Sequence, residues 1–252
     1  MVESVMPSAE KIDSFLTALY QTPNGNPTST IQRLRLVMLQ PLTTAAVIRY
    51  IVNLPVVGIS IREAERPEAT WLFDPRRPWN PSNFISSYLE LPSPLHLYWQ
   101  GQARQNLRKA SNRALSEGFK VRLIDTSEAS SVIEQVFEDK GRKTYEIQPM
   151  RHRLRESHEN DFCVAVFDDR GRAVAFCMGT QTGNAVRNYW ANTSLRGHVR
   201  WLCFTGFVEE ASERGIRFIV ESPPWSMNAV SRLFAHRLGF APARIRTERC
   251  SR

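Results

Sequence analysis

The sequence NAVSRLFAHRLGF, residues 228–240, is the stretch from which the rest of the chain is best interpreted. Its opening asparagine is a favourable helix start, apolar side chains follow at helical spacing, and Gly239 provides a stop. The preceding run at 216–221 is short and apolar, as in a buried strand. The order predicted for the C-terminus is therefore a strand over 216–221, a helix over 226–238 and a closing strand over 240–246.

Upstream of this stretch, helices and strands alternate from about residue 95. Helices are predicted over 101–117, 126–143 and 199–214, and strands over 119–124, 161–167, 173–179 and 185–192. The turn Asp168-Asp169-Arg170-Gly171 joins two of the strands as a hairpin. Hairpins followed by one crossover helix predict an α+β fold, in which helices flank a mixed, mostly antiparallel sheet.

The first 94 residues are interrupted by prolines and have a less regular rhythm. Helices are predicted over 8–20 and 41–53, and a strand over 56–62. A boundary near Leu95 is expected to separate an N-terminal extension or partial subdomain, 1–94, from the main domain, 95–252.

Composition narrows the class of protein further. The 252 residues are 42% hydrophobic and 23% charged, typical of a globular chain, and the four cysteines lie too far apart to indicate a metal site or a disulfide framework. The apolar run 42–61 contains Arg49, Asn53 and Pro55, so it is not predicted to cross a membrane. No secretory signal opens the chain, and a cytoplasmic location is expected.

The net charge of +8 is unevenly distributed. Residues 101–155 hold 12 basic and 7 acidic side chains, whereas residues 1–100 hold 8 of each. Such an excess favours contact with an anionic partner, either a phosphorylated donor or RNA, although a solvated basic face has the same composition.

The 228–240 stretch resembles the closing motif of the GCN5-related N-acetyltransferase (GNAT) superfamily, in which Asn, Ala, Leu-aromatic and Gly-Phe recur at this spacing. The resemblance implies a GNAT fold and an N-acyltransferase that moves an acyl group from acyl-CoA to an amine. The amide of Asn228 is expected to bind a polar arm of the donor. Ala229 and Leu233 are expected to pack inward. Phe234 stands where many members carry an aromatic hydroxyl that protonates the leaving thiolate.

The same resemblance places the donor's pyrophosphate at the turn before the helix predicted over 199–214. Backbone N–H groups at a helix N-terminus attract anions. The residues implicated are Arg196, Gly197, His198, Val199 and Arg200. The family's two glycines fall on His198 and Arg200, which is a departure because side chains there restrict how closely a pyrophosphate can approach the backbone.

A general base is also required, because an attacking amine must lose a proton. In the GNAT fold two neighbouring strands splay apart, here at Asn192 and Glu221, and Glu221 is the candidate base. A carboxylate bonded to the next turn would have the same position. The other predicted acceptor contacts are Tyr145, Glu146, Trp190, Asn192 and Trp225, whose aromatic members are equally suited to packing.

The segment Gly101–Ala110 and the strand after it resemble the first helix of the Fem-like branch of the same superfold. That branch includes transferases whose donor is aminoacyl-tRNA. The helix carries a basic stripe at Arg104, Arg108, Lys109 and Arg113, which is expected to bind RNA if this resemblance extends to function.

Three functions therefore stay open at the level of sequence. The leading one is an acyl-CoA-dependent N-acyltransferase acting by direct transfer without a metal. The second is an aminoacyl-tRNA-dependent aminoacyltransferase. The third is a GNAT-fold binding module without turnover, which Phe234, His198 and Arg200 would favour.

Overall fold

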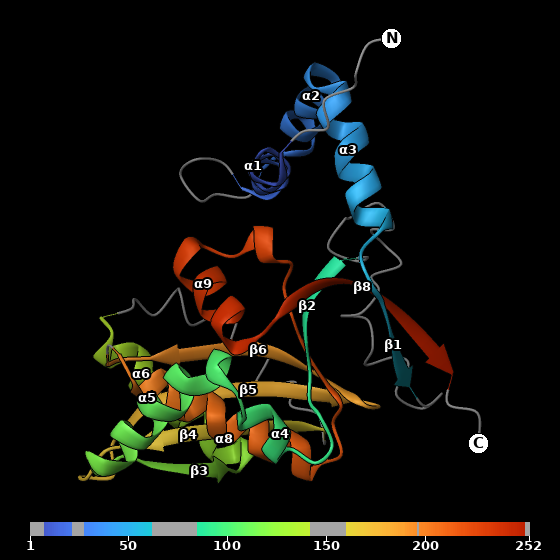
Figure 1. Ribbon diagram of the computed structural model, residues 1–252. Coiled ribbons are helices and arrows are strands. Elements are labelled where there is room, and N and C mark those ends of the chain that lie inside the picture. Colours follow the sequence, from blue (N-terminus) through green and yellow to red (C-terminus); the bar gives the residue numbers. More distant parts are fainter. Residues whose placement is uncertain (1–7, 22–27, 62–84, 142–159, 196, 250–252) are drawn as a thin grey trace. The chain divides into compact units, whose positions relative to one another are not determined.

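The computed structural model describes residues 8–21, 28–61, 85–141, 160–195 and 197–249 (Figure 1). The chain forms two compact units, each discontinuous in sequence. The first unit comprises Met1–Gly58, Phe73–Ser87 and Ser222–Arg246, and the second comprises Ile59–Leu72, Tyr88–Glu221 and Thr247–Arg252. Strands β1 (Val56–Ile61), β2 (Ile85–Glu90) and β8 (Ala241–Arg249) pass from one unit to the other.

The helices of the first unit begin where local sequence signals place them. They are α1 (Ala9–Tyr20), α2 (Thr30–Leu39), α3 (Pro41–Val52), the short 3-10 helix η5 (Pro224–Ser226) and α9 (Ala229–Leu238). The Ser8 hydroxyl caps α1, and Pro41 opens α3, so the helices predicted over 8–20 and 41–53 are confirmed. Helix α2 was not predicted; the signal for it is the capping box formed by Ser29 and Gln32.

The first unit packs around Trp225. This side chain is 3% exposed and lies in a cluster with Phe15, Leu16 and Tyr20 of α1 and Val47 of α3. Asp13 of α1 accepts a hydrogen bond from Trp225 Nε1 at 2.8 Å. The N-terminal helices and the segment after Glu221 thus share one core, although they are far apart in sequence.

Helix α9 differs from its predicted orientation. Leu233 is 51% exposed and Ala229 is also exposed, so the expectation that this pair packs inward is wrong. The buried residues of α9 are Ala235 and Leu238 in its last turns. The first turn instead carries the cap, in which Asn228 Oδ1 accepts from Ser231 N at 2.9 Å.

The second unit is built on antiparallel hairpins and one parallel crossover. Its elements are α4 (His96–Trp99), η4 (Gln102–Arg104), α5 (Gln105–Ser116), β3 (Lys120–Ile124), α6 (Thr126–Asp139), β4 (Asp161–Phe167), β5 (Ala173–Thr182), β6 (Ala185–Thr193), α8 (Val199–Glu213) and β7 (Phe218–Glu221). Within this unit the described strands pair in the order β7-β6-β5-β4-β3. Neighbours from β3 to β6 are antiparallel, and β6 and β7 are parallel. The predicted α+β class and mixed, mostly antiparallel sheet are confirmed.

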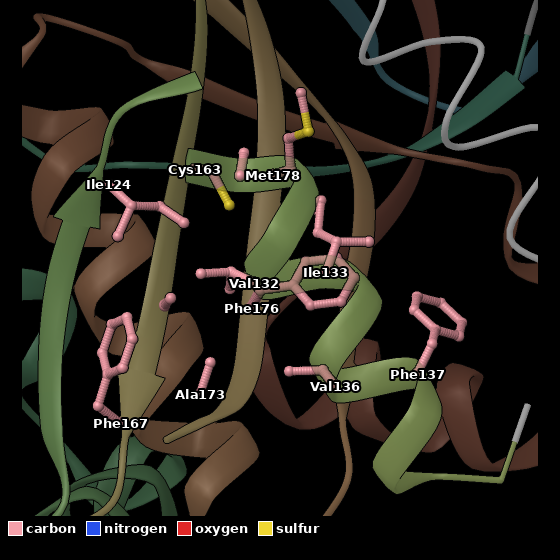
Figure 2. Packing of buried hydrophobic residues seen from close by; sticks show 12 residues of the cluster. Ile124, Val132, Ile133, Val136, Phe137, Cys163, Phe167, Ala173, Phe176 and Met178 are labelled. Carbon is pink, nitrogen blue, oxygen red and sulfur yellow. The ribbon is translucent and has the colours of Figure 1, made fainter. Parts of the chain in front are cut away.

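Helices cover both faces of this sheet because side chains alternate along each strand. Cys163, Ala165 and Phe167 of β4 lie in one buried cluster with Ile133 and Val136 of α6. Figure 2 shows Cys163 and Phe167 on the side of the sheet that faces α6. The intervening Val164 faces α8, where its carbonyl lies 3.7 Å from the thiol of Cys203. Strand β4 is buried along its whole length, which explains its nearly continuous apolar sequence.

Among the described residues, no single helix is both long enough and apolar enough to cross a membrane. Helices α2 and α3 meet the length and composition criteria only when taken together, and they are bent by 107° at the break between them.

Candidate active site

The candidate site lies where β6 and β7 part. The two strands pair in parallel as far as Arg187 and Val220, after which β7 ends at Glu221 and β6 continues. Strand β6 also carries a bulge against β5, since Met178 pairs with Trp190 but Gly179 pairs with Asn188. A bulge bends its strand and interrupts its ladder. The residues at the end of the parallel pairing, Asn188 and Glu221, are thereby brought together.

Glu221 is held by a hydrogen-bonded chain that crosses three strands. Asn188 Nδ2 donates to Glu221 Oε1 at 2.5 Å, and Asn188 Oδ1 accepts from the thiol of Cys177 on β5 at 3.4 Å. Asn188 is 8% exposed and Cys177 is fully buried. Since the thiol occupies the amide oxygen, the Asn188 side chain presents its NH₂ group to the carboxylate.

Burial raises the pKa of the Glu221 carboxyl to about 7. The Asn188 hydrogen bond and the positive charge of Arg200, in the first turn of α8, act in the opposite direction and lower it. Burial also lowers the pKa of Arg200, and the Glu221 charge counteracts that effect. A carboxyl group with this pKa is partly ionised near neutral pH, where it can take a proton and later release it.

A glycine precedes the N-terminus of α8. Gly197 has φ +94° and open space around the position of a Cβ atom, and Val199 is buried as the first helical residue. The N-cap residue His198 makes no side-chain hydrogen bond to the helix. Its Nε2 instead bonds Glu117 at the end of α5, and its ring lies 6.3 Å from that of Phe119. The His198 side chain is thus held by the α5–β3 connection.

The remaining predicted acceptor contacts have different placements. Asn192 is half-buried, and its Oδ1 accepts from Lys140 Nζ. Trp225 belongs to the core of the first unit, which gives it the packing role that the sequence left open. Trp190 lies in β6 but its side chain is not described, and Tyr145 and Glu146 lie outside the described residues. Arg196, predicted to contact the donor, also lies outside them. The contacts proposed for these four residues stay predictions.

Three arginines of the basic stripe on α5 contact other groups of the second unit. Arg108 donates to the carbonyls of Trp99 and Gly101, and the Arg104 guanidinium lies 4.9 Å from the centre of the Tyr98 ring. Arg113 forms an ion pair with Glu117 at 2.8 Å. Lys109 is exposed. RNA binding by this stripe stays a prediction.

Two members of the site were not predicted as functional residues. Asn188 and Cys177 lie in strands whose other positions are mostly apolar, so a polar residue in such a strand was the available signal. Among the described residues, no cluster of His, Cys, Asp and Glu has the arrangement of a metal site.

The crossover from β6 through α8 to β7, the bulge in β6 and the parting of the two strands define the GNAT fold. FemX aligns with a TM-score of 0.50 and 10% identity over 63% of this chain and 59% of that chain. L-PGS from Bacillus licheniformis aligns with a TM-score of 0.45 and 12% identity over 95% and 90%.

An aminoglycoside antibiotic 6′-N-acetyltransferase from Acinetobacter baumannii aligns with a TM-score of 0.36 and 18% identity, over 54% of this chain and 96% of that chain. No protein-family model matches the sequence, and no curated protein is similar to it. The chain spans less than two thirds of the length of FemX.

Proposed function

We propose that the protein is an N-acyltransferase that moves an acyl group from acyl-CoA to an amine by direct transfer. The observation that supports this function best is Glu221. Its pKa is near 7, it lies at the parting of β6 and β7, and Asn188 fixes its orientation. A base at this point of a GNAT fold can accept a proton from an amine as the new N–C bond forms.

The groups around Glu221 adjust its pKa for this proton transfer. Asn188 stabilises the ionised carboxylate through its N–H group, and the positive charge of Arg200 does the same. Burial acts against both and keeps the carboxylate basic enough to take a proton at neutral pH. The proton leaves the amine nitrogen and is bound by a Glu221 oxygen, directly or through one water.

The N-terminus of α8 is suited to the anionic part of the donor. Gly197 allows close approach to the backbone, the first-turn N–H groups carry partial positive charge, and Arg200 adds a guanidinium. The His198 side chain bonds Glu117 and packs beside Phe119, so it is directed toward α5. These features accommodate a pyrophosphate despite the two missing glycines. Acyl-CoA supplies the acyl group, whose C–S bond breaks as the N–C bond forms, and coenzyme A leaves as the thiol.

Two measurements test the donor and the base separately. Coenzyme A at millimolar concentration should raise the melting temperature of the protein, since a ligand that binds the folded state stabilises it. Glu221→Gln should keep this shift and reduce amine acylation about a hundredfold. The matched control is Glu209→Gln, which removes another glutamate whose pKa is raised by burial and should keep normal turnover. A missing coenzyme A shift would refute the donor assignment; an unchanged rate in Glu221→Gln would refute the base.

The second candidate is an aminoacyl-tRNA-dependent aminoacyltransferase. Exposed Lys109, the net charge of residues 101–155 and the His198 and Arg200 substitutions favour it. It predicts stabilisation by aminoacyl-tRNA rather than by coenzyme A. Binding should weaken steeply with salt, by a log–log slope of about one for each phosphate contacted.

A further inference from the structure

Helices α2 and α3 expose an unusual amount of apolar surface, here called the α2–α3 face. Seven large apolar side chains of the two helices are between 57% and 81% exposed: Ile31, Leu34, Met38 and Leu39 of α2, and Leu42, Ile48 and Val52 of α3. Ile31, Leu34 and Met38 follow i, i+3, i+7 spacing and form one stripe on α2. An exposed apolar stripe of this kind marks a contact site.

The opposite sides of the two helices pack against the core of the first unit. Leu36 and Val37 of α2, and Val47, Tyr50 and Ile51 of α3, pack in or against the core around Trp225. The helices therefore cannot turn the α2–α3 face inward without breaking that core. With 10 and 12 residues, each helix is also much shorter than the roughly 20 residues needed to span a bilayer.

The charge around this face has one sign. Exposed Arg35 and Arg49 lie among its apolar side chains, and the sequence contains no Asp or Glu from residue 14 to residue 62. An amphipathic helix that lies in a membrane interface has this combination, with the apolar stripe among the acyl chains and the arginines at the phosphate level.

We propose that the α2–α3 face docks onto the surface of an anionic phospholipid bilayer. The helices lie in the interface, with their apolar side chains inserted and Arg35 and Arg49 bound to lipid phosphates. A second copy of the chain fits less well. A symmetric contact would bring these arginines toward the same arginines of the partner, with no carboxylate in residues 14–62 to balance them.

Vesicle co-sedimentation of the full chain tests this proposal. The protein should bind vesicles of phosphatidylglycerol and phosphatidylcholine at low salt, and pure phosphatidylcholine much less. Leu34→Gln combined with Met38→Gln should weaken binding at least tenfold. Arg35→Gln combined with Arg49→Gln should weaken it roughly thirtyfold, at about fivefold for each charge.

The matched control is Leu115→Gln combined with Leu123→Gln, which removes two leucines that are 50% and 49% exposed in the second unit. This variant should bind vesicles like the unmodified protein. The melting temperature of each variant confirms folding.

Three results would overturn the proposal: no binding to anionic vesicles, binding that survives the Leu34 and Met38 changes in a folded variant, or equal loss in the control. A concentration-dependent dimer in sedimentation equilibrium that those changes abolish would assign the face to a second copy. None of these results bears on acylation, which is measured with acetyl-CoA and a soluble amine.

Discussion

The position of Glu221 predicts an unusual dependence of stability on pH. Its carboxyl group ionises with a pKa near 7 in the folded protein, compared with 4.5 in a model compound. Between these values the folded state binds more protons than the unfolded state, so the contribution of Glu221 to stability falls as pH rises. It is fully present below about pH 4.5 and lost above pH 7.

Glu221→Gln removes this loss while keeping the shape of the side chain. The amide oxygen of glutamine can still accept from Asn188 Nδ2, so the chain to Cys177 is preserved. At about 1.4 kcal/mol per pKa unit, the shift corresponds to about 3 kcal/mol. The variant should therefore match the unmodified protein near pH 4.5 and exceed its stability by up to about that amount near pH 8.

Urea denaturation of both proteins at pH 5 and pH 8 measures this difference. The expected result is a gap in the free energy of unfolding that widens with pH. A gap that does not depend on pH would refute the argument that burial raises the pKa of Glu221. A variant less stable than the unmodified protein at pH 8 would show that the carboxylate has a structural role.

Three further changes test other parts of the chain. Asn188→Ala should move the acidic limb of kcat/KM upward by about one pH unit, because it removes a hydrogen bond that favours ionised Glu221. Gly183→Ala should lower the free energy of unfolding in urea by about 2–4 kcal/mol. The reason is that Gly183 has φ +57° and an added Cβ would lie 1.7 Å from a backbone oxygen of β1. Gly171→Ala is the control: its φ is +75° but the space around it is open, so the free energy of unfolding should fall by only about 1 kcal/mol. Asn228→Ser should keep the helix cap and most of the stability of the protein, because a serine side chain also caps a helix. If the Asn228 amide binds the donor, the variant should show a smaller rise in melting temperature with coenzyme A. An unchanged rise would leave Asn228 with its capping role alone.

Sequence alone determined most of the elements and the fold class. Caps, glycine stops and apolar periodicity act over a few residues, so helices such as α6, α8 and α9 and the hairpin of β4 and β5 were predicted to within a few positions. The resemblance of residues 228–240 to the GNAT closing motif then placed these elements in a known order, and Glu221 could be selected because it ends a buried strand.

Only the tertiary structure decided what surrounds that carboxylate. Asn188 and Cys177 come from neighbouring strands, and Arg200 comes from a helix. The distances of Asn188 and Cys177 from Glu221 are set by β-sheet pairing and by the bulge in β6, not by spacing in the sequence. The same holds for Trp225, whose partners on α1 lie more than 200 residues away. Local sequence specifies helices and strands, whereas pKa values and packing partners depend on contacts between distant segments, which appear only when the chain is folded.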